Sequence, residues 1–203
     1  MLQEEMRDVF DGIAEVPTVM AFRRGKMRAV PAPHPDGEVV FRHNPLATLA
    51  SRGCSKDCYF CGVPMTDGAL VELPDFPVRP ILCDNNLSAL PAKYQDHIIE
   101  RYWAEGVKMI DANSGFEPDT FDEEVYLRWR PLVNAGGGPW RFGYDTTSEA
   151  KQCRRVMRML SDEPQKRKRV YVLIGNEPFA ACMARIQDVL DHGCEPHCQP
   201  YLA

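Results

Sequence analysis

The sequence predicts a mixed α/β fold in which parallel strands form a sheet with helices outside it. Short apolar runs alternate with segments of helical periodicity, and each run ends in polar residues. Strand followed by helix, repeated along a chain, is typical of a parallel sheet, because parallel strands need a long crossover connection. Six such units are too few for an eight-stranded barrel. The apolar runs cover residues 46–50, 80–83, 107–112, 140–144, 170–174 and 196–202.

Helix boundaries between these runs are marked by proline, glycine and capping pairs. Proline is favoured where a helix begins, glycine just after a helix ends, and Thr with Glu three residues later forms a capping box. These signals predict four helices, each between two strands. They are Pro91 with Gly106, Thr120 with Glu123, Thr146 with Glu149, and Pro178 with Gly193.

Composition points to one ordinary globular core. The chain has 203 residues, of which 44% are hydrophobic and 26% are charged, which is enough to bury one sizeable core. The net charge of -5 argues against a surface that binds nucleic acid. No apolar run approaches the ~20 residues that a membrane helix needs, and the N-terminus does not resemble a secretory signal. We therefore expect a cytoplasmic protein without a membrane partner.

Two domain-level segments are expected, a lead at residues 1–45 and a core at residues 46–203. Apolar residues recur at helical spacing between Leu2 and Ile13, which predicts a helix there. Apolar segments on both sides of residues 24–25 predict a hairpin, and a further short strand is expected at 39–41. The lead is expected to pack on the core. Residues 68–74 are too short and irregular for a helix, so we expect an extended excursion there.

Three cysteines after the first apolar run form the strongest chemical signal. Cys54, Cys58 and Cys61 have Cys-x3-Cys-x2-Cys spacing within one loop, and thiolates this close indicate a metal site. They could bind three irons of a [4Fe-4S] cluster and leave the fourth iron open to another ligand. A structural zinc site is an alternative, although zinc sites usually show paired Cys-x2-Cys knuckles and only one such pair is present. A disulfide framework and simply buried thiols are further alternatives.

With Phe60 directly before the third cysteine, the motif resembles the Cys-x3-Cys-x-aromatic-Cys signature of the radical S-adenosylmethionine (radical SAM) superfamily. The resemblance covers residues 46–201. It implies a partial (β/α)6 barrel, open on one side, with the cluster loop after the first strand. It also implies two cofactors, a [4Fe-4S] cluster and S-adenosyl-L-methionine (SAM). The implied activity is reductive cleavage of SAM to a 5'-deoxyadenosyl radical, which abstracts hydrogen from an unknown substrate.

The polar residues that follow each run are the expected cofactor contacts, because barrels of this kind place chemistry at the carboxyl ends of their strands. By resemblance, the segment after the second run faces the methionyl group, later strand ends face the ribose and adenine, and Phe60 lies near the adenine. The same residue types are also common in turns and caps. The expected contacts are Asp84, Asn85 and Asn86 for the methionyl end, Asn113 and Asp145 for the ribose, and Ile174 with Gly175 for the adenine.

The chain departs from the family pattern in two places. Residues 174–178 enter their helix sooner than in similar proteins. The sequence also stops at Ala203, where family members commonly continue with a segment that covers the barrel. This implies that the substrate is large and closes the site, that a partner protein closes it or carries the substrate, or that the protein is degenerate. The resemblance also implies an external reductant such as a flavodoxin or ferredoxin.

The alternative to an enzyme is a protein that binds a metal without catalysis. The rival is a non-catalytic protein whose truncated barrel keeps a zinc ion or an electron-transfer iron-sulfur cluster. The remaining cysteines do not help to decide, since packing of small buried thiols accounts for them. Cys83 would lie near the cofactor and could also act as a reactive thiol. The other four are Cys153, Cys182, Cys194 and Cys198.

Overall fold

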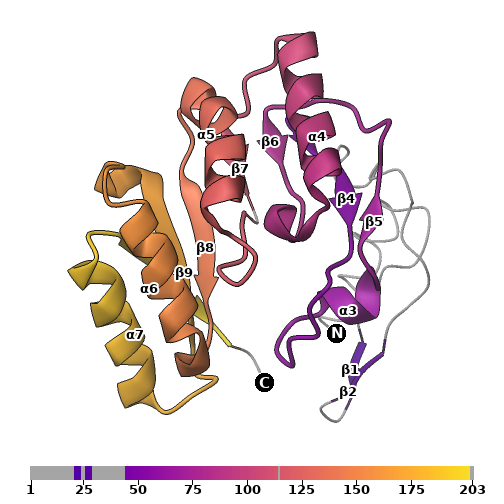
Figure 1. The fold of residues 1–203 in the computed structure, drawn as a ribbon. Helices are drawn as coiled ribbons and strands as arrows, with labels where there is room; N and C mark the ends of the chain where they lie inside the picture. The colour runs from indigo at the N-terminus through magenta and orange to yellow at the C-terminus, as the bar shows by residue number, and fades with distance from the viewer. Residues whose placement is uncertain (1–20, 24–25, 29–43, 114, 202–203) are drawn as a thin grey trace.

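The computed structural model describes residues 21–23, 26–28, 44–113 and 115–201, and its architecture is the predicted mixed α/β arrangement. Two three-stranded sheets, parallel throughout, form its framework (Figure 1). The described strands do not close into a barrel. The first sheet contains, in spatial order, β3 (Ala47–Thr48), β6 (Ile81–Leu82) and β7 (Asp111–Ala112). The second contains β8 (Trp140–Tyr144), β9 (Lys168–Ile174) and β10 (Glu195–Pro200).

The two sheets meet at the segment that follows β7. The Phe116 amide donates to the Arg141 carbonyl at 3.0 Å, and Phe116 forms a parallel bridge with Phe142 of β8. Gly115 has a φ of 74°, and a Cβ atom there would lie 2.3 Å from the same carbonyl oxygen, so glycine is required. The Arg141 guanidinium also donates to Asp111 of β7, with Nε 2.6 Å from Oδ1. These contacts bring the last strand of the first sheet beside the first strand of the second.

Four long helices connect the strands and pack along one side of the sheets (Figure 1). They are α4 (Ala92–Glu105), α5 (Glu123–Gly136), α6 (Ala150–Met159) and α7 (Phe179–Asp191). Shorter helical turns are α3 (Val63–Thr66), η1 (Leu87–Ala89), η2 (Thr147–Glu149) and η3 (Gln165–Arg167).

Most of the expected helix boundaries are confirmed. Pro91 is the N-cap residue of α4 and Gly106, in the left-handed conformation, is its C-cap residue. Pro178 is the N-cap residue of α7. The capping box of Thr146 and Glu149 is present at η2, which leads directly into α6.

The expected capping box at the start of α5 is wrong. Asp122 is the N-cap residue, and its carboxylate accepts from the Val125 amide at 2.9 Å. Thr120 instead shares a 2.8 Å hydrogen bond with Ser88 near η1. An aspartate caps as well as a threonine, and its charge favours the helix N-terminus. Asp122 therefore takes the N-cap position, and the Thr120 hydroxyl is engaged by Ser88 instead.

The short strands outside the two sheets agree with the expected hairpin and excursion. β1 (Ala21–Arg23) and β2 (Lys26–Arg28) pair antiparallel on both sides of residues 24–25. β4 (Ser51–Arg52) pairs antiparallel with β5 (Val71–Glu72), inside the predicted excursion. The expected helix near the N-terminus and the strand at 39–41 lie outside the described residues. Within the described chain, no helix has the length and apolar character to cross a bilayer.

Two apolar clusters hold this framework together. The larger one surrounds the junction of the sheets and is rich in aromatic rings, with Phe116 in ring contact with Phe121, Trp129 and Trp140. The smaller one lies between the second sheet and α6 and α7. Three cysteines are buried in the protein as expected, namely Cys153, Cys182 and Cys194.

β10 forms one edge of the second sheet. The Tyr201 amide donates to the Ile174 carbonyl at 2.8 Å, so odd-numbered residues turn their backbone groups toward β9 and even-numbered residues toward the free edge. Pro196 and Pro200 occupy even positions, where no amide hydrogen is needed. Cys198 lies between them and is exposed. The expectation that it is a buried thiol is wrong, because this edge strand is largely uncovered.

Candidate metal and cofactor site

The cysteine loop begins where β4 ends and is fixed at its first residues. Gly53 has a φ of 77°, and a Cβ atom there would lie 2.2 Å from the Ala69 carbonyl oxygen, so the two backbones approach too closely for any other residue. The Cys54 amide donates to the Gly68 carbonyl at 3.3 Å. The excursion at 68–74 therefore supports the base of the cysteine loop.

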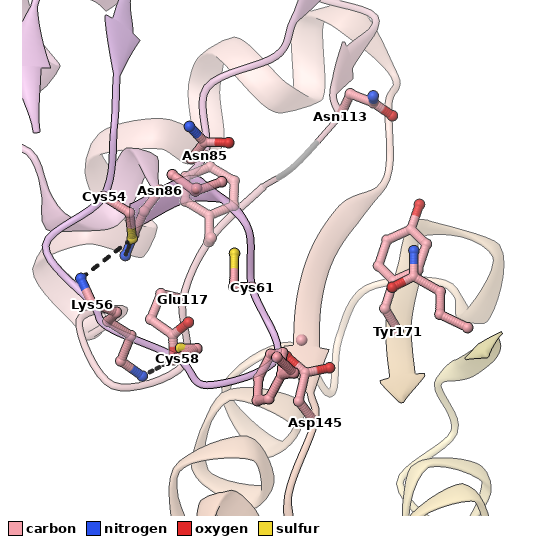
Figure 2. A pocket seen from close by; sticks show the side chains of 15 residues that line it. Cys54, Lys56, Cys58, Cys61, Asn85, Asn86, Asn113, Glu117, Asp145 and Tyr171 are labelled. Carbon is pink, nitrogen blue, oxygen red and sulfur yellow. Dashed lines mark hydrogen bonds and ion pairs between the residues drawn. The ribbon is translucent and has the colours of Figure 1, made fainter. Parts of the chain in front are cut away.

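Lys56 fixes the middle of the cysteine loop to the segment after β7. Its Nζ atom lies 2.6 Å from Glu117 Oε1 (Figure 2) and 2.6 Å from Asp119 Oδ2. Burial disfavours the ammonium ion, but hydrogen bonds to Asp119 and Glu117 outweigh this and raise the pKa of Lys56. Burial also raises the pKa of Glu117, and Lys56 partly opposes that shift. The loop is thus held by a partly desolvated three-charge network.

The three cysteine side chains of this loop line one pocket of about 380 Å³. Burial raises the pKa of Cys58 to about 11, and it also raises the pKa of Cys61. The Lys56 amide, at 3.4 Å, and the Asn86 side-chain amide, at 4.0 Å, direct hydrogens at the Cys54 sulfur. Because burial opposes their ionisation, the free thiols of Cys58 and Cys61 keep their protons near neutral pH. A metal that binds them must therefore displace these protons.

Figure 2 shows the three sulfur atoms at separate positions around the pocket. Correspondingly, among the residues that the structure describes, no group of three His, Cys, Asp or Glu side chains is arranged to hold a single metal ion. A cluster that gives each thiolate its own iron requires separated sulfurs, whereas one tetrahedral ion requires them to converge.

Three asparagines from the ends of β6 and β7 line the same pocket. Asn85 donates to the Gly53 carbonyl at 3.4 Å, at the start of the cysteine loop. Asn86 uses its side-chain oxygen to cap η1, accepting from the Ala89 amide at 3.1 Å, so its NH2 group is left to face Cys54. Asn113 follows β7, and its side chain hydrogen bonds to the half-buried Cys83. The structure therefore brings all three predicted amides together.

Asp84 lies behind the pocket and does not line it. Its carboxylate is fully buried and accepts from the Ser51 hydroxyl at 2.6 Å and the Ala50 amide at 3.0 Å. Burial raises the pKa of Asp84 to about 6, although these hydrogen bonds oppose the shift. Asp84 therefore connects the end of β6 to the start of the cysteine loop, and its side chain is already fully engaged.

Asp145, after β8, lines the pocket with a carboxylate that accepts no hydrogen bond from any described residue. Burial, followed by the charges of Glu149 and Glu117, raises the pKa of Asp145 to about 7. A Cβ atom at Gly143 would lie 3.0 Å from Asp145 Oδ2, so the missing side chain makes room for the carboxylate over the strand. Even a partly buried acid without donors is costly unless water or a ligand supplies them.

Comparisons with known proteins supply no relative. The chain matches no protein-family model, no curated protein and no solved structure. The chemistry of the site therefore has to be argued from its own residues.

Of the three residues expected to contact the adenine, one lines the pocket and two do not. Phe60 lines the pocket and packs edge-on against Tyr59, with ring centroids 5.0 Å apart. Ile174 and Gly175 do not line it. The next residue, Asn176, instead donates to the Asp145 carbonyl at 2.6 Å, so this loop supports Asp145 from outside the pocket.

Several residues that line the pocket were not predicted from the sequence. Lys56 and Glu117 form a pair 61 positions apart, and no local pattern marks such a pair. Tyr171 and Gln199 lie within β9 and β10 rather than at strand ends. Their position could have been found from the two-residue period of a strand, since both fall on the side that faces the pocket.

The charges around the pocket favour a cation. Among its lining residues, Glu117 and Asp145 are acidic groups and Lys56 is basic. Because Lys56 is already neutralised by Glu117 and Asp119, the field in the pocket is negative when Asp145 is ionised.

Proposed function

We propose that the protein is a radical SAM enzyme that holds a [4Fe-4S] cluster on Cys54, Cys58 and Cys61 and binds SAM beside it. The observation that supports this most is a single pocket, at the carboxyl ends of the parallel strands, that contains all three cysteines and the unpaired carboxylate of Asp145. Neither feature alone specifies the activity, but together they fit a cluster and a cationic ligand. The two sheets would then be the two halves of a partial barrel.

The residues present fit these cofactors in chemistry. Three separated thiols can each bind one iron and leave a fourth for the amine and carboxylate of SAM. The pocket volume of about 380 Å³ lies near the lower end of the range for pockets that take one small ligand. When bound, the cluster and SAM supply the reductive cleavage that yields a 5'-deoxyadenosyl radical, with electrons from an external reductant such as a flavodoxin or ferredoxin.

The chain's own residues orient and shield these groups. The NH2 groups of Asn85, Asn86 and Asn113 donate hydrogen bonds to carboxylate or hydroxyl oxygens, and the Asp145 carboxylate accepts from an ammonium or a ribose hydroxyl. Phe60 covers the adenine side. Asp84 contributes indirectly, because its bonds to Ala50 and Ser51 fix the start of the cysteine loop. The second sheet faces the substrate.

The test is anaerobic reconstitution with iron and sulfide, followed by an assay for 5'-deoxyadenosine with SAM and a reductant. Wild-type protein should bind about four irons per chain and release 5'-deoxyadenosine. The Cys54→Ala, Cys58→Ala, Cys61→Ala triple variant should lose both properties. The Cys194→Ala, Cys198→Ala double variant is the matched control and should keep its iron.

Equal iron loss in the control would contradict the assignment of the ligands. A reduced cluster that neither binds SAM nor yields 5'-deoxyadenosine would leave the non-catalytic iron-sulfur function. One zinc ion per chain in place of iron and sulfide would leave the structural zinc function. The proposal extends to a large substrate or to one delivered by a partner protein.

A further inference from the structure

The loop after β8 holds Asp145 by its backbone. The Asp145 amide donates to Glu149 Oε2 at 2.7 Å, and the Asp145 carbonyl accepts from the Asn176 side chain at 2.6 Å. Two residues further on, the Thr147 amide donates to Glu177 at 3.0 Å. The backbone groups of Asp145 are therefore fixed by side chains, whereas its carboxylate has no donor among the residues that the structure describes.

Asn176 reaches Asp145 because the strands before these two residues end side by side. β8 and β9 are parallel neighbours, so the residues that follow them emerge at the same edge of the sheet. Gly175, directly after β9, has a φ of 100°, a conformation that favours glycine, and Pro178 is the N-cap residue of α7. Asn176 thus lies in a short link between this turn and the start of the helix.

The orientation of the Asn176 amide is set by Arg185 of α7. Arg185 is 1% exposed, and its guanidinium donates to the Tyr144 carbonyl at 2.5 Å and to the Leu173 carbonyl at 2.8 Å, near the ends of β8 and β9. It also donates to Asn176 Oδ1 at 3.2 Å. Because a guanidinium only donates hydrogen bonds, the amide oxygen has to face Arg185, and the NH2 group then faces the Asp145 carbonyl.

Arg185 is itself held in place by an acid. Its Nε atom lies 3.2 Å from Glu177 Oε2, the oxygen that also accepts from Thr147. A cation this buried is tolerated only when it is paired and hydrogen bonded, so Arg185 is fixed in one position. Burial is the main cause that raises the pKa of Asp145, and the charge of Arg185 opposes the rise. Arg185 therefore orders this loop and favours the ionised form of Asp145.

We propose that Asn176, oriented by Arg185, is a positioning residue for Asp145, which it holds so that the carboxylate lies at the pocket before a ligand arrives. Asn176 does not line the pocket, so it acts through Asp145 and not by touching the ligand. When the loop is ordered in advance, ligand binding does not bear the entropy loss of ordering it. The inference rests on the proposed function for the identity of the ligand, SAM, whose positive charge suits the carboxylate.

The first test compares SAM affinity in reconstituted wild-type protein and in Asn176→Leu, measured by equilibrium dialysis. Leucine has nearly the size of asparagine and adds no charge, but it leaves the Asp145 carbonyl without its partner. SAM binding should weaken about tenfold at unchanged iron content, the effect of losing one hydrogen bond to a charged group. Asn176→Ala should give the same loss. Asn134→Leu, at an exposed asparagine of α5, is the matched control and should bind SAM as wild type does.

A double-mutant cycle separates positioning from a general structural role. If Asn176 acts through Asp145, Asn176→Leu should weaken SAM binding less than about twofold once Asp145→Ala has removed the carboxylate. A side chain that only keeps the protein folded would cause the same tenfold loss in both backgrounds. Additive effects of the two substitutions would therefore overturn the inference.

The second test needs neither SAM nor a reductant. In protein without cofactors, the amides of residues 144–147 should exchange hydrogen at least about tenfold faster in Asn176→Leu than in wild type, while exchange in α5 does not change. Unchanged exchange at residues 144–147 would overturn the inference whether or not SAM binds. Faster exchange in a protein that never binds SAM would keep the positioning of Asp145 and contradict the proposed function. Equal SAM affinity of wild type and Asn176→Leu would do the reverse.

Discussion

The two sheets are stabilised by different kinds of contacts. Strands β3, β6 and β7 have two residues each, whereas β8, β9 and β10 have five, seven and six. The first half is therefore held largely by side chains that reach loop backbone, as when Tyr94 donates to the Ala50 carbonyl at 2.7 Å. The second half is held by continuous ladders. Loops fixed by side chains suit a metal site, while long strands suit a surface of regularly spaced side chains.

One fully buried and one partly buried aspartate show the same contrast. Asp84, in the first half, has partners for both carboxylate oxygens and supports the backbone. Asp145, in the second half, has no donor for either oxygen among the residues that the structure describes, and it lines the pocket. Burial raises the pKa of both, so burial alone does not identify a ligand-binding acid. The absence of hydrogen-bond donors among the described residues is what marks Asp145 as an acid that can bind a ligand.

The largest expected effect comes from breaking the junction between the halves. Phe116→Ala removes a ring that is 2% exposed and packs against four aromatic neighbours from both sides of the junction. We expect a loss of about 3–5 kcal/mol in the free energy of unfolding, as for other buried Phe truncations. Urea unfolding measures it. Leu127→Ala on α5, 55% exposed, is the control, and an equal loss there would show that the halves do not depend on this contact.

The second effect tests the structural role of Asp84. Its pKa is raised from 3.8 to about 6 in the folded protein, so between these pH values unfolding releases a proton. The free energy of unfolding therefore falls as pH rises through this window, by about 3 kcal/mol from this group. Asp84→Asn cannot titrate and should gain that much relative to wild type between pH 4 and pH 7.

Urea unfolding of both proteins across this range measures the difference, with Asp75→Asn, at an exposed aspartate, as the control. A constant difference between Asp84→Asn and wild type at every pH would mean that Asp84 does not titrate in this window.

The third effect tests how the cysteine loop is fixed. Lys56→Met removes the cation between Glu117 and Asp119 and leaves Glu117 partly buried without its partner. We expect a loss of about 1–2 kcal/mol, because both groups keep some access to water. The reconstituted cluster should also release iron faster to a chelator. Lys151→Met, at an exposed lysine of α6, should change neither; similar iron release from both variants would argue against the anchor.

The smallest effect concerns Asp145 and the binding of SAM. Because its pKa is about 7 without ligand, the carboxylate that favours a cation is lost as pH falls. Wild-type affinity for SAM should therefore rise about tenfold between pH 6 and pH 8. Asp145→Asn should bind about tenfold more weakly at pH 8 and show no such rise. Equilibrium dialysis measures both, and a parallel rise in the variant would assign the titration to another group.

The sequence predicted the structure correctly where residues close together in the chain determine the local conformation. The alternation of strands and helices predicted the parallel α/β fold, and Pro91 with Gly106 predicted both ends of α4. The asparagines after β6 and β7 reach the expected pocket because strand ends meet at one edge. Local patterns failed where distant groups compete. Asp84 turns toward Ser51, Thr120 turns toward Ser88, and neither partner could be known before the strands were arranged.

The prolines of β10 have a consequence for association. Because Pro196 and Pro200 occupy the outward positions of this edge strand, only the Cys198 amide can donate to an incoming strand. Backbone pairing of another chain with this edge is therefore disfavoured. Copies of the protein are therefore protected from edge-to-edge aggregation at this strand. A molecule that binds along this edge therefore contacts side chains rather than backbone groups. Its recognition depends on the hydrogen bonds and packing that those side chains offer.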